Sequence, residues 1–141
     1  MDFCGWSFFV DTGGTFTDCL GLSPENEWFR AKVLSRGSLV AEVVEQTDSQ
    51  KLKIADAPDW PKGIVQGFTL HFAGLERFYS KIIDWDPFSN ELTLEDVLPS
   101  RINFPIAIEL SSGWEAPVLG MRLILSRNGL DWKSMKTEMR L

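Results

Sequence analysis

The residues best suited to chemistry form one short stretch, Val10-Asp11-Thr12-Gly13-Gly14-Thr15-Phe16-Thr17-Asp18. Apolar runs on both sides predict two strands joined at the glycines. A glycine pair at a hairpin tip can adopt positive φ, and without Cβ atoms its N–H groups can approach an anion closely. The hydroxyls of Thr12, Thr15 and Thr17 can donate to phosphate oxygens, and Asp11 can hold Mg²⁺ through water. The stretch predicts a phosphate-binding turn, and an ordinary glycine hairpin with solvated threonines is the alternative.

The register of this hairpin bears on the two cysteines. A two-residue loop at Gly13 and Gly14 places position 8 opposite position 19. Cys4 then lies several residues out of register with Cys19, too far for a disulfide. Neither cysteine has a His or Lys beside it in the sequence, so we expect two free thiols with structural roles.

Composition limits the size, partners and compartment of the protein. With 141 residues, of which 44% are apolar, the chain can form one ordinary domain or a compact domain with a small insert. A net charge of −6 argues against nucleic acid or an anionic membrane as a partner, because both require a basic surface. The sequence predicts neither a transmembrane helix nor a signal peptide, which indicates the cytoplasm.

Three segments follow from the patterning, and together they predict a mainly β (α+β) fold. Residues 1–35 predict an antiparallel meander with strands at 6–11, 15–22 and 27–34. Residues 36–112 predict an inserted antiparallel module, a small barrel or sandwich, with short strands near 40–45, 51–54, 68–72, 78–85, 91–94 and 106–110. Residues 113–141 predict one helix and a tail that return to the meander.

The ends of the predicted helix have recognisable signals. Two starts fit the sequence: a capping box between Ser112 and Glu115, or a start that puts Pro117 at the first helical position. Asn128 and Gly129 predict its end.

Other polar residues have simpler interpretations. His71 shares a strand face with Thr69, opposite the phenylalanines, so we expect it to face solvent. With one histidine and two separated cysteines, a zinc site is not expected. Asp84 and Asp86 flank a turn and are interpreted as solvated acids rather than an acid–base pair.

A strand, a glycine turn and a second strand differ from the strand–loop–helix arrangement of Walker and Rossmann sites. Residues 8–22 resemble the N-terminal phosphate-binding hairpin of the hydantoinase/5-oxoprolinase (hydantoinase A) family, which belongs to the actin-like ATPase superfamily. Residues 30–35 and 115–122 are similar to two further parts of that family. The resemblance implies an incomplete actin-like/ribonuclease H-like subdomain with an insert between its third strand and first helix.

The resemblance also implies an activity and a set of roles. In the family, ATP with Mg²⁺ phosphorylates the amide oxygen of a small cyclic amide, which then opens by hydrolysis. Asp11 would be the catalytic residue that orients Mg²⁺ or the transfer, and Asp18 would brace the turn. The phosphate-binding residues implied by the resemblance are Thr12, Gly13, Gly14, Thr15 and Thr17.

The sequence contains one such glycine segment, whereas enzymes of this superfamily need a second phosphate-binding hairpin and an adenosine loop. We therefore expect the front part of a longer ATP-dependent hydrolase, inactive alone and dependent on the rest of the parent enzyme or a second subunit. An open sheet edge and apolar face predict self-association of this part. Two alternatives are a non-catalytic β module that docks a partner subunit through the insert, and part of a sugar-kinase-type phosphotransferase.

Overall fold

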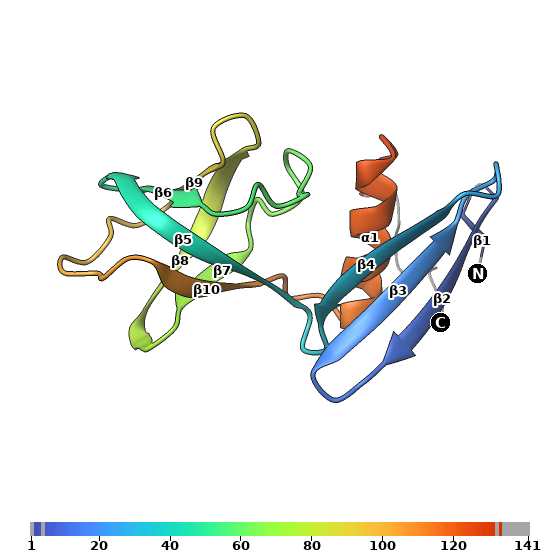
Figure 1. The fold of residues 1–141 in the computed structure, drawn as a ribbon, viewed down its shortest axis with the longest axis horizontal. Helices are drawn as coiled ribbons and strands as arrows, with labels where there is room; N and C mark the ends of the chain where they lie inside the picture. The colour runs from blue at the N-terminus through green and yellow to red at the C-terminus, as the bar shows by residue number, and fades with distance from the viewer. Residues whose placement is uncertain (1, 4, 132, 134–141) are drawn as a thin grey trace. The chain divides into compact units, whose positions relative to one another are not determined.

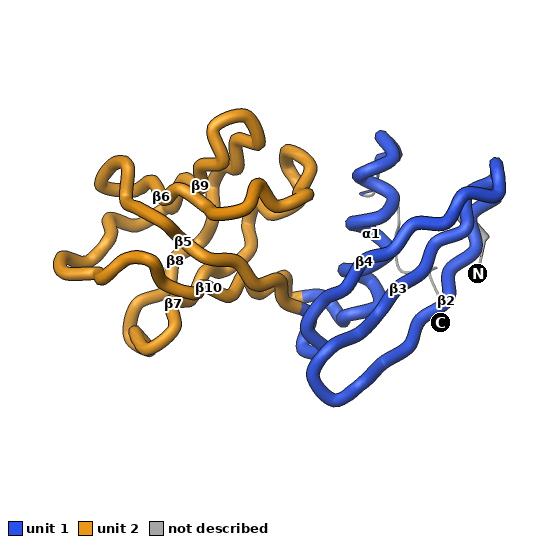
Figure 2. The backbone as a smooth tube through the Cα atoms, viewed as in Figure 1, with its two compact units in different colours: residues 1–37, 114–141 blue, residues 38–113 orange. Residues whose placement is uncertain are grey.

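The computed structural model describes residues 2–3, 5–131 and 133 (Figure 1). These residues form ten strands and one helix, so the predicted mainly β fold is confirmed. Contacts divide the chain into two compact units (Figure 2): unit 1 comprises residues 1–37 and 114–141, and unit 2 comprises residues 38–113. Among the described residues, no helix combines the length and apolar character that a membrane span requires.

Unit 1 is an antiparallel sheet with a helix on one face. Its strands lie in the order β1-β2-β3-β4. Their bounds are Asp2–Phe3 for β1, Trp6–Thr12 for β2, Phe16–Leu22 for β3 and Trp28–Leu34 for β4. The predicted meander is confirmed, and β1 is an additional strand that the sequence pattern does not predict. Helix α1 (Ala116–Arg127) contacts β3 and β4 (Figure 1).

Helix and sheet approach each other closely at two glycines. Cys19, Ala31 and Val33 are buried on the face of the sheet that α1 covers. A Cβ atom on Gly120 of the helix would lie 2.8 Å from the Cβ of Cys19. A Cβ atom on Gly21 of β3 would lie 3.0 Å from Cγ2 of Ile124. The absence of side chains at these two positions therefore sets the spacing between the layers.

The start of α1 differs from both predictions, whereas its end agrees. Glu115 is the N-cap and makes no side-chain capping bond, so the capping box does not form. Pro117 occupies the second helical position, where its missing N–H is not needed. At the other end the N–H groups of Gly129 and Leu130 donate to carbonyls of the last turn, and Gly129 has φ 75°. This is a Schellman motif, which confirms the predicted stop.

Unit 2 is a closed barrel, which decides between the two predicted architectures. Its strands are antiparallel and follow the order β5-β10-β7-β8-β9-β6, and β6 pairs back with β5. Their bounds are Ser38–Asp48 for β5, Lys51–Ile54 for β6, Thr69–Phe72 for β7, Leu75–Asp86 for β8, Glu91–Leu94 for β9 and Ile106–Ser111 for β10. Closure leaves no free edge in this unit.

The barrel has its own apolar core and closely spaced ends. Trp85 is fully buried, its indole N–H donates to the carbonyl of Trp60 at 2.8 Å, and the two rings lie 5.2 Å apart. Ser38 at the start of β5 pairs with Ser111 at the end of β10. Because the barrel begins and ends at neighbouring positions, it fits between two elements of another unit. The unit boundaries differ by one or two residues from the expected limits of 36 and 112.

Candidate phosphate-binding hairpin

The turn between β2 and β3 has its tip one residue later than predicted. The N–H of Gly13 donates to the carbonyl of Phe16 at 2.9 Å, which leaves Gly14 and Thr15 as the two tip residues. Neither glycine has a positive φ. The prediction of a Gly13-Gly14 loop with left-handed glycines is therefore wrong.

Moving the tip by one residue changes the strand register by two. Val10 lies opposite Cys19, where the sequence analysis placed position 8. Cys19 is free and fully buried, and burial raises the pKa of its thiol from about 9.0 to about 12. The expected structural thiol is confirmed for this residue, and Cys4 lies outside the described residues.

The tip is open to solvent. Gly13, Gly14 and Thr15 are exposed, and a Cβ atom on Gly14 would meet nothing within 4 Å. Within the described part of the chain, no hydrogen bond reaches the N–H of Gly14 or Thr15. Two adjacent backbone donors are therefore available to an anion that approaches the turn.

Ser35 braces this turn from the end of β4. Its hydroxyl donates to the carbonyl of Gly13 at 2.7 Å, and its N–H donates to the carbonyl of Thr15 at 2.8 Å. The Ser35 and Thr17 hydroxyl oxygens lie 2.9 Å apart. Since the Ser35 proton is directed to Gly13, the Thr17 hydroxyl is the donor in this pair.

Thr17 consequently lies beneath the turn rather than on its open side. Its side chain is fully buried, and its hydroxyl is engaged by Ser35. The sequence predicts Thr17 as a phosphate ligand, and nothing in its spacing indicates the bond to Ser35. The only sequence feature that marks Ser35 is its position at the end of the 30–35 segment, which is similar to the family. The spacing of residues does not indicate that it bonds to the hairpin.

Asp11 and Thr12 point to opposite faces of β2, as neighbours in a strand must. Val10 and Thr12 lie on the side of the buried Cys19, whereas Asp11 lies on the side facing away from α1. Both Asp11 and Thr12 are exposed. A metal held by Asp11 would therefore approach from the uncovered side of the sheet, away from Thr12.

Asp18 lies directly opposite Asp11 on that uncovered side. Arg30 binds it through two nitrogens, Nε at 3.0 Å and Nη2 at 2.7 Å, both to Oδ1. This ion pair reduces the repulsion between the facing carboxylates. Both aspartates line a hollow of about 410 Å³ together with Phe9, Val10, Leu20 and Arg30. Among the described residues no three His, Cys, Asp or Glu side chains are grouped to hold a metal.

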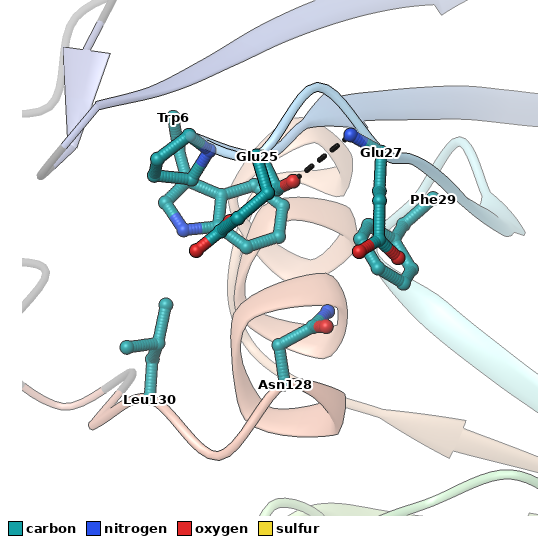
Figure 3. Close-up of a pocket in the computed structure, with 8 residues that line it drawn as sticks. Trp6, Glu25, Glu27, Phe29, Asn128 and Leu130 are labelled. Atoms are coloured by element: carbon teal, nitrogen blue, oxygen red, sulfur yellow. Dashed lines mark hydrogen bonds between the residues drawn. The ribbon is translucent and has the colours of Figure 1, made fainter.

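A second hollow in unit 1 lies at the other end of β3, beside the β3–β4 turn. Figure 3 shows the residues that line it. It has a volume of about 360 Å³ and contains two carboxylates, Glu25 and Glu27, beside the rings of Trp6 and Phe29. The backbone N–H of Glu27 donates to the Ser23 hydroxyl at 3.0 Å, which fixes the β3–β4 turn (Figure 3). None of the predicted phosphate-binding residues lines this hollow.

The remaining candidates in unit 2 are placed as solvated groups. His71 is exposed and stands 6.0 Å from the ring of Tyr79, which confirms the prediction. Asp84 lies 4.0 Å from Lys62, and both side chains are more than half exposed. The Asp86 carboxylate accepts the N–H of Phe88 at 2.9 Å, and this bond lowers its pKa.

Fold and site together define a mainly β protein of two units: a helix-backed sheet that carries a braced, exposed hairpin, and a closed barrel inserted in the sequence of that unit. No protein-family model matches the sequence, and neither does a curated protein or a solved structure.

Proposed function

We propose that this chain is the N-terminal part of an ATP-dependent hydrolase of hydantoin-like or 5-oxoproline-like cyclic amides. Unit 1 would be the incomplete actin-like/ribonuclease H-like subdomain, and its β2–β3 hairpin would be the first phosphate-binding element. The observation that supports this best is the pair of open N–H groups at Gly14 and Thr15 on a turn braced by Ser35. Residues 8–22 add the resemblance to the family.

The described residues fit a triphosphate in part. The N–H groups of Gly14 and Thr15 and the Thr15 hydroxyl would donate to the β- and γ-phosphate oxygens. The net charge of −6 repels a polyanion, so Mg²⁺ ordered by Asp11 is needed to offset it. When bound, ATP supplies the phosphoryl group that activates the amide oxygen of the substrate. Thr17 would contribute through Ser35, by fixing the turn before the ligand arrives.

Turnover would require residues beyond those described. The second phosphate hairpin and the adenosine-binding loop would come from the rest of the parent enzyme or a second subunit. The chain alone would therefore bind the triphosphate weakly and hydrolyse nothing, because charge developing in transfer needs donors on both sides.

Nuclear magnetic resonance can test this proposal on the 141-residue chain. We expect Mg²⁺ with inorganic triphosphate, and Mg²⁺ with ATP, to shift the amide signals of Gly14 and Thr15. AMP, which lacks the β- and γ-phosphates, should shift them far less. Asp11→Asn should weaken the response, whereas Asp84→Asn, the same charge change in unit 2, should leave it unchanged. Shifts that avoid the hairpin, or that ignore Asp11→Asn, would contradict the proposal.

A docking role for unit 2 is the second candidate, and side-chain exposure favours it. Val40, Tyr79 and Phe88 expose 56%, 63% and 100% of their surface. A closed barrel offers side chains rather than a strand edge, so a partner subunit would contact these residues. If this is the function, added partner should shift signals in unit 2 while triphosphate leaves the hairpin signals unmoved.

A further inference from the structure

The side of the β2–β3–β4 sheet that faces away from α1, here called the outer face, exposes large apolar side chains. Phe9, Phe16, Leu20 and Trp28 are 53%, 41%, 39% and 58% exposed. The rings of Phe9 and Trp28 approach to 5.7 Å, yet both stay more than half exposed. Sheets with apolar side chains on both faces are normally covered on both, and grouped exposed apolar residues mark interaction sites.

Charges on the outer face follow a directional pattern across the strands. Asp11 of β2, Asp18 of β3 and Lys32 of β4 form one row. Arg30 neutralises Asp18 at the centre. The net result is a carboxylate on β2, a neutralised centre and a cation on β4.

Beside that row the centre of the face is apolar. Leu20 of β3 lies between Phe9 of β2 and Arg30 of β4. The ammonium of Lys32 lies 4.6 Å from the centre of the Phe16 ring, which holds this cation on the outer face. The face therefore combines an apolar middle with opposite charges on its two flanks.

We propose that two copies of this chain pack outer face to outer face, around a twofold axis that runs along β3. This axis places β2 of each copy over β4 of the other. Asp11 then meets Lys32 of the second copy, twice. The outward residues of β3 meet their own equivalents: Leu20 at the apolar centre, and Asp18, whose charge its own Arg30 offsets. Aligned packing of this kind is a standard arrangement of two sheets about 10 Å apart.

The charge pattern selects this axis over the alternative. A twofold axis across the strands, through Leu20, would place β4 over β4 and bring Arg30 toward its own copy, and Asp11 would lie away from Lys32 of the second copy. Like charges in that arrangement would repel, whereas the axis along β3 makes both flanks attractive. The same self-complementarity favours a second copy over an unrelated partner, because an isologous interface must match itself.

This inference goes beyond the proposed function and does not depend on nucleotide. Because Asp11 has a role in both, association is measured without Mg²⁺ or phosphate. Sedimentation velocity of the 141-residue chain should show a concentration-dependent monomer–dimer equilibrium. Asp11→Lys and Lys32→Asp should each weaken the dimer about tenfold or more, since each reversal creates two like-charge contacts per dimer.

Charge exchange supplies the decisive control. The Asp11→Lys, Lys32→Asp double variant should restore dimerisation, and so should an equimolar mixture of the two single variants, in which both contacts are again opposite in sign. Glu76→Lys and Lys81→Asp make the same charge changes on exposed residues of unit 2 and should leave the equilibrium unchanged. Protection of the Cys19 thiol reports that unit 1 of each variant is folded.

Three results would overturn the inference. The wild-type chain could remain a monomer at every concentration, which would leave the outer face to a different occupant such as the rest of a parent enzyme. A dimer insensitive to both single reversals would place the interface elsewhere. A double variant weaker than either single one would show that these two residues do not meet across the interface.

Discussion

Replacement of Ser35 by alanine tests the brace on which the open hairpin depends. The Gly13 carbonyl lies in an exposed turn, so water can replace the lost donor at a net cost of about 0.5–1.5 kcal/mol. The Thr17 hydroxyl is fully buried and would lose its acceptor without gaining water, which costs about 1–3 kcal/mol. We therefore expect Ser35→Ala to lower the free energy of unfolding of unit 1 by about 1.5–4.5 kcal/mol.

Urea titration can measure this loss, with reaction of the Cys19 thiol as a probe confined to unit 1. Thr17→Val in the same background removes the stranded hydroxyl at nearly constant shape. The double variant should therefore regain about 1–2 kcal/mol over Ser35→Ala alone. Ser49→Ala, on an exposed turn of unit 2, is the control and should change little. A loss below about 0.5 kcal/mol for Ser35→Ala, or no recovery in the double variant, would refute the reasoning.

Three further predictions follow from close approaches and burial. Gly120→Ala should destabilise unit 1 by about 1–2 kcal/mol in thermal unfolding, because overpacking against Cys19 exceeds the gain in helix propensity; in a Cys19→Gly background the penalty should vanish. Gly13→Ala should destabilise the hairpin, since its Cβ would lie 3.0 Å from the carbonyl oxygen of Phe16, whereas Gly14→Ala should fold normally in circular dichroism. The pKa of the Cys19 thiol is about 12 in the folded chain and about 9.0 in the unfolded chain. Its contribution to stability is therefore complete below pH 9.0 and declines as pH rises toward 12. Cys19→Ala should remove this part of the fall in unfolding free energy at alkaline pH, as measured by urea titration.

Local patterns in the sequence account for most of the elements. Alternation predicted β2, β3 and β4 within a residue or two, and the Asn128-Gly129 signal predicted the end of α1. These features depend on neighbours along the chain, which periodicity and turn residues describe. Closure of the barrel cannot be predicted from such local patterns, because the pairing of β6 with β9 joins residues about forty positions apart. The close spacing of short strands was the one sequence feature that indicated a barrel.

The hairpin tip shows where local reasoning failed. The sequence Thr12-Gly13-Gly14-Thr15 is compatible with a two-residue tip at Gly13-Gly14 or at Gly14-Thr15. The residue preferences of hairpin turns favour Gly13-Gly14. The observed tip is held by Ser35, which bonds Gly13 across 22 residues and also accepts the Thr17 hydroxyl. A non-local clamp thus decides both the register and which threonine faces solvent. The same clamp separates the predicted site residues into a supporting group and an exposed group.

Asp11 links the two proposals, and this link can be measured. In the proposed dimer it meets Lys32 of a second copy, whereas in the proposed triphosphate complex it orders Mg²⁺. If both assignments are correct, each event opposes the other by the same factor, because linkage is reciprocal. Mg²⁺ with inorganic triphosphate should therefore lower the dimer fraction in sedimentation, while Mg²⁺ alone at the same ionic strength should lower it less. Raising the concentration of the chain should correspondingly weaken the response of the Gly14 amide signal. A dimer fraction unaffected by triphosphate, with the hairpin shown to be occupied, would mean that Asp11 does not serve both contacts.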